Sequence, residues 1–111
     1  MTFFNRGNMK RLLGDNRGAI ADYNKCIELD PKAEDAYNNR GNSNYYLNKY
    51  TEAIADYTAA IKLNPNYAEA YYSRGITKKQ LNDKDGACFD LSKAGELGDM
   101  KAYDMIKKYC N

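Results

Sequence analysis

Histidine is absent from the 111-residue sequence, and cysteine and proline are scarce, with three and two residues respectively. Without histidine, neither a Ser/His nor a Cys/His nucleophile can be built, so we expect no enzymatic activity. No apolar run approaches the about 20 residues of a membrane span, and no membrane partner is expected. The formal net charge is only +2, with Lys and Arg interleaved with Asp and Glu. A stripe of positive charge is therefore missing, which argues against nucleic acid as a partner.

The three cysteines, Cys26, Cys88 and Cys110, lie far apart in the sequence. A metal site needs Cys or His at close spacing, so we expect no metal and no cofactor. Cys26 and Cys88 fall on buried helical positions, whereas Cys110 is expected to be exposed beside the C-terminus. A Cys88–Cys110 bridge could form if the last segment folded back, but an odd count without a disulfide framework favours a reducing compartment. We therefore expect a cytoplasmic protein.

The sequence does contain an internal repeat with a period of 34 residues. Arg-Gly recurs at 6–7, 40–41 and 74–75, and Ala-Ile-Ala-Asp-Tyr occurs unchanged at 19–23 and 53–57. A fixed period of this length indicates one supersecondary unit copied in tandem, because each copy buries its apolar face only against a neighbour. The sequence therefore predicts a solenoid whose function lies on its surface.

Each copy is expected to form two antiparallel helices. In the middle copy, residues 34–47 and 51–63 carry small and apolar residues three or four apart, and the turn Asn48-Lys49 separates them. A short connection makes the two helices antiparallel, and Pro65 ends the second. Over the whole chain the pattern predicts no strand, and a first helix without a preceding cap. The expected helices lie near residues 2–13, 17–29, 34–47, 51–63, 68–81, 84–97 and 99–109.

The positions of the apolar and small residues carry a family resemblance. In the three copies they are Phe3, Gly7, Leu13, Ala19, Tyr23, Cys26 and Pro31; Tyr37, Gly41, Leu47, Ala53, Tyr57, Ala60 and Pro65; and Tyr71, Gly75, Leu81, Ala87, Leu91 and Ala94. This pattern resembles the tetratricopeptide repeat (TPR). The third copy departs from it, since Leu91 replaces the tyrosine and Asp99 the proline.

The resemblance implies an all-α fold, namely a right-handed superhelical solenoid of antiparallel helix pairs. Residues 1–111 would form a single TPR domain, with repeats at about 1–33, 34–67 and 68–98 and a capping helix at 99–110. Such a helix would close the open end of the stack, where a terminal unit needs a polar outer face.

One recurrent column pairs an arginine on each first helix with an aspartate on each second helix. The favoured interpretation is an internal ion pair that holds the two helices together. The alternative is that the arginines bind a ligand. The column consists of Arg6, Arg40 and Arg74 with Asp22, Asp56 and Asp90.

Other polar residues vary between copies and lie on the first helices, which the resemblance places along a concave, peptide-binding face. An asparagine amide offers donor and acceptor together, so it can pair with any peptide backbone, while tyrosine adds rigid apolar contact. The alternative is that Asn and Tyr reflect only a biased composition. The candidate peptide-binding residues are Asn8, Arg11, Asn38, Asn39, Asn42, Tyr45, Tyr46, Tyr72 and Lys79.

Family members that bind the C-terminal carboxylate of heat-shock chaperones use two asparagines and three basic residues. Asn8 and Asn39 match the asparagines, but Phe4, Glu69 and Ser73 stand at the basic positions. Because Glu69 would repel a carboxylate, the sequence disfavours a chaperone tail as the partner.

The expected function is therefore binding of a partner protein or peptide on the concave face, without catalysis. A structural or self-assembling unit is the alternative, because Phe3 and Phe4 open a first repeat that has no neighbour and could be buried between copies. An engineered, consensus-like repeat is a further alternative, since one pentapeptide is repeated unchanged. The irregular third copy and the cysteines favour a natural chain.

Overall fold

The computed structural model describes residues 1–110, and no strand occurs in that range. Every helix boundary lies within one residue of the position predicted from the sequence. In the described part of the chain, no helix has the length and apolar character needed to cross a membrane. The helices are α1 (Phe3–Leu12), α2 (Asn16–Leu29), α3 (Glu34–Tyr46), α4 (Tyr50–Leu63), α5 (Ala68–Gln80), α6 (Lys84–Glu96) and α7 (Met100–Tyr109).

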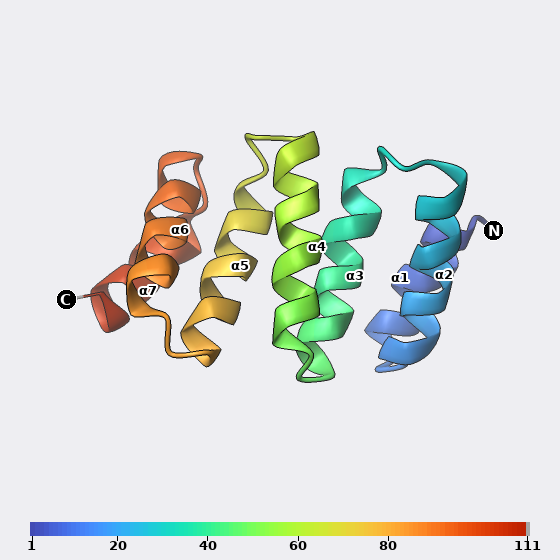
Figure 1. Cartoon of the computed structure of the whole chain (residues 1–111), viewed down its shortest axis with the longest axis horizontal. Helices are drawn as coiled ribbons and strands as arrows, with labels where there is room; N and C mark the ends of the chain where they lie inside the picture. The colour runs from blue at the N-terminus through green and yellow to red at the C-terminus, as the bar shows by residue number, and fades with distance from the viewer. Residues whose placement is uncertain (111) are drawn as a thin grey trace.

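The helix pairs follow one another in a row along the long axis of the molecule, with the two termini at opposite ends (Figure 1). Each helix packs against the next, and the molecule measures 44 × 25 × 21 Å along its principal axes. In addition, α1 touches α3, and α3 touches α5, so the first helices of successive repeats line one side of the row. This arrangement is the all-α solenoid that the 34-residue period predicts.

Side-chain caps and turn residues set the ends of the helices. The expectation that the first helix lacks a cap is wrong, because Thr2 Oγ1 accepts a hydrogen bond from the Asn5 N–H at 3.0 Å. The turn inside each repeat passes through left-handed backbone, with φ of 87° at Gly14 and 62° at both Asn48 and Asn82. Glycine and asparagine tolerate this conformation, so these turns occur at equivalent positions 34 residues apart.

The glycine of each Arg-Gly pair marks a place where two helices of one repeat come close together. A Cβ atom added at Gly41 would lie 2.8 Å from Cε1 of Tyr57. At Gly7 the corresponding atom would lie 2.9 Å from the Tyr23 ring. Tyr23 and Tyr57 are fully buried, so the repeated glycine is a packing requirement and not a flexible point.

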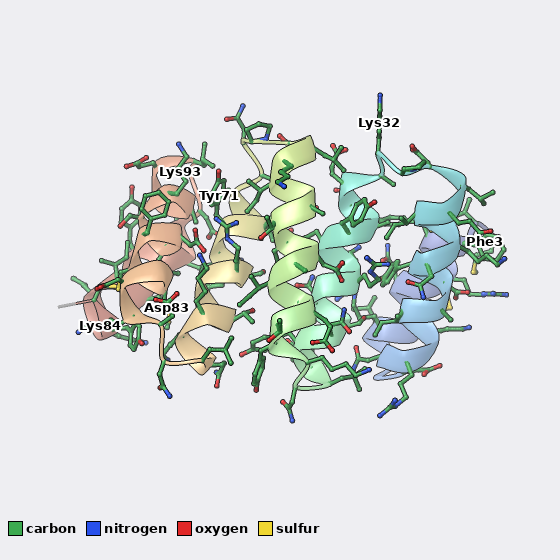
Figure 2. The ribbon with its side chains drawn as sticks, viewed as in Figure 1. Phe3, Lys32, Tyr71, Asp83, Lys84 and Lys93 are labelled. Atoms are coloured by element: carbon green, nitrogen blue, oxygen red, sulfur yellow. A yellow bond between two sulfur atoms is a disulfide. The ribbon has the colours of Figure 1, made fainter. Side chains whose placement is uncertain are left out.

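A disulfide between Cys88 and Cys110 joins α6 to the end of α7, with Cα atoms 5.8 Å apart. Figure 2 shows its yellow bond near the labelled Lys84, at the C-terminal end of the stack. The expectation of an exposed Cys110 is therefore wrong: α7 folds back along α6 and leaves this cysteine partly buried against the Leu91 cluster. Cys26 is the free cysteine of the described chain and is half-buried.

Candidate functional site

A cavity of about 360 Å³ lies along α3 and α5, which supply most of its lining. We call it the central cavity. One residue each from α1, α4 and α7 completes its wall. The lining is polar and aromatic, and two cationic side chains face one anionic side chain. It consists of Arg11, Asn42, Tyr45, Tyr46, Tyr57, Glu69, Tyr72, Ser73, Ile76 and Lys101.

Tyrosines of the second helices hold the asparagines of the first helices in place. The Tyr57 hydroxyl donates to Asn42 Oδ1 at 2.7 Å. In the preceding repeat the Tyr23 hydroxyl donates to Asn8 Oδ1, and Asn39 Nδ2 donates to the same oxygen at 2.9 Å. Burial raises the pKa of both phenols, so both remain protonated donors near neutral pH. The asparagine amides are therefore oriented before any ligand arrives.

Five of the candidate residues do line the central cavity, namely Arg11, Asn42, Tyr45, Tyr46 and Tyr72. Asn8 and Asn39 lie in the hydrogen-bonded group beside it and are half-buried. Lys79 does not line the cavity, because its ammonium lies over the Tyr109 ring of α7, 5.2 Å from the centroid.

Asn38 was expected on the peptide-binding face, but the structure buries it completely. The reason is that α3 is a middle helix of the row and packs against α2 and α4 on either side. Asn38 Oδ1 has no hydrogen-bond partner, and a peptide cannot reach it. Helical spacing alone does not reveal which positions of a middle helix are covered by both neighbours.

Two lining residues, Lys101 and Tyr57, lie outside the first helices, and sequence reasoning missed both. Lys101 belongs to α7, which was expected to serve only as a cap, and its ammonium lies 4.9 Å from the centroid of the Tyr72 ring. No signal within the repeat could have found it, because α7 lies outside the 34-residue period. Tyr57 was assigned to the core, where its ring does lie, but it also forms part of the cavity wall.

The arginine column forms internal ion pairs, as the favoured interpretation predicted. The shortest nitrogen–oxygen distances are 2.6 Å for Arg6–Asp22, 2.6 Å for Arg40–Asp56 and 2.8 Å for Arg74–Asp90. Each arginine also lies over the aromatic ring three residues before it, at 5.4 to 5.6 Å. These guanidinium groups are already engaged in holding helix pairs together, and they lie outside the central cavity.

The aspartates differ in how many cations they contact. Asp22 also pairs with Lys10 at 3.3 Å, and Asp90 with Lys78 at 3.0 Å. At the equivalent position of the middle repeat stands Asn44, whose amide donates to Asp56 at 3.0 Å. Asp56 therefore depends on one cation, whereas the other two aspartates have two each.

The Asp22 pair predicts a pH dependence of stability. The hydrogen bond from Arg6 is the main cause that lowers the pKa of Asp22 below its ordinary value of 3.8, although burial opposes it. The pKa of Asp22 is lower in the folded state than in the unfolded state. The ion pair therefore makes its full contribution to the free energy of unfolding above the unfolded-state pKa, and this contribution is lost as the pH falls through the folded-state pKa. We expect the melting-temperature difference between wild type and Asp22→Asn to be constant above about pH 5 and to shrink towards about pH 2. A difference that stays constant over this acidic range would contradict the assignment.

Among residues 1–110, no group of three or more His, Cys, Asp or Glu side chains is placed to hold a metal ion. The fold and the cavity together define a helical-repeat protein with a polar, aromatic binding surface. The family model described as TPR repeat matches residues 7–47 and 41–82. These matches span more than half of the chain, which therefore belongs to the TPR repeat family.

Solved structures agree with this family. The chain is 27% identical, with a TM-score of 0.93, to the structure described as the first TPR of Spaghetti (RPAP3) bound to the HSP90 peptide SRMEEVD, covering 97% of this chain and 87% of that one. It is 28% identical, with a TM-score of 0.92, to the second TPR domain of human RPAP3 in complex with the HSP70 peptide SGPTIEEVD, covering 99% and 93%. The Arabidopsis OM64 TPR domain, at 23% identity, a TM-score of 0.94 and coverage of 97% and 91%, shows the fold alone. No match to a curated protein sequence was found.

These findings support a protein-interaction module. They do not support the expectation that disfavoured a chaperone tail, since two of the similar structures hold chaperone peptides. That expectation was based only on Phe4, Glu69 and Ser73, which stand at the positions where the chaperone-binding family members have basic residues. The structure brings two cations, Arg11 and Lys101, to the cavity from other positions.

Proposed function

We propose that this protein binds an extended, carboxylate-bearing peptide of a partner protein in the central cavity, on the concave side formed by α1, α3 and α5, and that it performs no catalysis. The observation that carries the proposal is the set of pre-oriented asparagines beside the tyrosines of the cavity, of which Tyr46 is exposed. Asn42 Oδ1 accepts from Tyr57, which leaves its amide N–H groups directed to other partners. Tyr46 is 68% exposed and offers a large apolar face with a polar tip.

The charges at the cavity favour an acidic peptide. Arg11 and Lys101 contribute two positive charges, against one negative charge from Glu69. A carboxylate placed near the two cations gains charge-assisted hydrogen bonds, which are stronger than neutral ones. The chaperone peptides SRMEEVD and SGPTIEEVD of the similar structures are therefore suitable first probes.

Replacing Tyr46 with alanine is expected to weaken binding of a fluorescent SRMEEVD peptide by about 10-fold in an anisotropy titration, because truncation removes an aromatic contact. Stability should change by under about 0.5 kcal/mol, since the ring is mostly exposed. Phe89→Ala is the matched control, because Phe89 is 69% exposed on α6 and does not line the cavity. Equal losses in the two variants, or a loss only in Phe89→Ala, would place the binding surface elsewhere.

The asparagines are less suitable than Tyr46 for this test. Asn42→Ala would leave the buried Tyr57 hydroxyl without its acceptor. An unsatisfied buried group costs about 1–3 kcal/mol, so lost binding could not be separated from lost stability. Tyr46 avoids this difficulty.

Self-association remains the second candidate function, and the exposed apolar residues at the N-terminal end favour it. Leu12 and Leu13 are 77% and 81% exposed at the end of α1. A second copy that covered them would extend the row or close it as a dimer. Light scattering over a range of concentrations decides this: a mass that rises with concentration supports self-association, and a constant monomer mass rules it out over that range.

A further inference from the structure

The C-terminal helix α7 contacts α5 at both of its ends, and its start also contacts the wall of the central cavity. Near its start, the Lys101 ammonium lies 4.9 Å from the centroid of the Tyr72 ring on α5. Near its end, the Tyr109 ring lies beneath Lys79 of α5, at 5.2 Å. Lys101 also lines the cavity. The helix therefore does more than close the stack, because it supplies one of the two cations of the site.

Non-covalent contacts hold α7 against α6, and they include a hydrogen bond from the Tyr103 hydroxyl to the Gly95 carbonyl at 3.1 Å. Ala102 is its single fully buried residue, and Met105 and Ile106 are partly buried against Leu91 and Ala94 of α6. A helix of 10 residues is too short to persist by itself in water. Its position thus depends strongly on what anchors its two ends.

Both ends of α7 are anchored covalently. The backbone ties its start to α6 through Gly98 and Asp99, where Asp99 Oδ1 caps the helix. The Cys88–Cys110 disulfide ties its other end to the first half of α6. By the loop-closure argument, breaking a bridge across a separation of 22 residues makes opening of the enclosed segment about 100-fold more frequent.

We propose that α7 is part of the peptide-binding site, with Lys101 contacting a carboxylate of the ligand, and that the Cys88–Cys110 disulfide holds it there and makes the affinity redox-dependent. This inference rests on the proposed function. The Lys101 side chain is 66% exposed, and its ammonium is 3.8 Å from Asp99 Oδ2. The Asp99 side chain is only 8% exposed, but the pair is long and its lysine is exposed, so a peptide carboxylate can share the ammonium.

The switch is an ordinary thiol–disulfide exchange. A dithiol reductant transfers two electrons and two protons: its own sulfurs become a disulfide, the Cys88–Cys110 bond breaks, and both cysteines become thiols. With the bridge open, α7 separates from α5 more often, and whenever it does so the cavity loses Lys101. Disulfides persist in oxidising compartments, so the high-affinity form belongs there. In the reducing cytoplasm expected from the cysteine count, the same chain would be in its weak form.

The test measures SRMEEVD affinity for the oxidised chain, for the chain reduced with dithiothreitol, and for the double variant Cys88→Ser/Cys110→Ser, with folding checked by circular dichroism. We expect reduction and the double variant to weaken binding by about 10-fold, the effect of losing a charged contact from an interface. In the oxidised chain, Lys101→Gln should weaken binding by about the same factor, and in the reduced chain it should have little further effect. Lys62→Gln removes an equal charge from the exposed face of α4 and should change neither form.

Hydrogen exchange of residues 100–109 provides a readout that needs no ligand. We expect exchange there to rise by about 100-fold on reduction, with α3 and α4 unaffected. If the oxidised chain binds the peptide and reduction opens the bridge without changing affinity or exchange, the inference is overturned while the proposed function stands. Tighter binding after reduction would also overturn it, because α7 would then obstruct the site. If the oxidised chain binds neither chaperone peptide, the choice of an acidic ligand fails for both proposals, and exchange alone decides whether the disulfide holds α7.

Discussion

Replacing Arg40 with alanine is expected to lower the free energy of unfolding by about 3 kcal/mol or more, because the change leaves a buried carboxylate without a cation. Asp56 is 5% exposed. It accepts from Arg40 Nε at 3.0 and 3.1 Å and from Arg40 Nη2 at 2.6 Å. After the substitution, only the neutral amide of Asn44 would remain within hydrogen-bond distance. Urea unfolding at neutral pH measures the change, provided that the slope of the transition stays constant.

Arg6→Ala is the matched control for this prediction. It removes the equivalent arginine of the first repeat, but Lys10 remains 3.3 Å from Asp22. The Arg6 side chain is also 51% exposed, compared with 24% for Arg40. A clearly smaller loss is therefore expected. If the two substitutions lower the free energy of unfolding equally, then Lys10 does not compensate for the loss of Arg6 and the prediction is wrong.

The second large effect is expected from Gly41→Val, which should cost about 3 kcal/mol, at the upper end of overpacking penalties. The added Cβ would lie 2.8, 3.0 and 3.1 Å from three atoms of the Tyr57 ring. The Tyr57 ring cannot move aside easily, because this residue is 1% exposed and its hydroxyl donates a hydrogen bond to Asn42. Thermal unfolding followed by circular dichroism measures the loss.

A double-mutant cycle identifies the cause of that loss. All three of the nearest atoms to the added Cβ belong to Tyr57, so Gly41→Val should cost less in a Tyr57→Leu background than in the wild type. The third repeat already carries leucine at this position, where Leu91 is opposite Gly75. If the two changes are simply additive, contact with the Tyr57 ring is not the cause of the penalty at Gly41.

The helices could be predicted closely because their signals are local and occur three times. One 34-residue unit contains all of these signals: the spacing of its apolar residues, its turn positions and a proline such as Pro65. Most of the same signals recur in the other copies. The ion-pair column was predictable for the same reason, since Arg40 and Asp56 recur in step with their counterparts. Asn38 was misplaced because a helical pattern does not reveal that two neighbouring helices cover the same residue.

The cavity was only half predictable. Tyr45, Tyr46 and Tyr72 lie on first helices, where the repeat pattern placed them. Lys101 could not be found in this way, because it comes from a helix outside the repeat. The same helix explains the error at Cys110, whose distance from Cys88 depends on how α7 folds back.

The sequence by itself determined the class of fold, the number of helices and the pairing of arginines with aspartates, because all of these repeat with the 34-residue period and need only contacts between adjacent elements. The tertiary structure alone decided which polar side chains remain accessible, that Lys101 and Arg11 reach one cavity, and that Cys88 and Cys110 are bonded. The physical reason is distance along the chain. Arg11 and Lys101 are far apart in sequence and belong to no common repeat, so only the packing of the helices between them brings both to the same cavity.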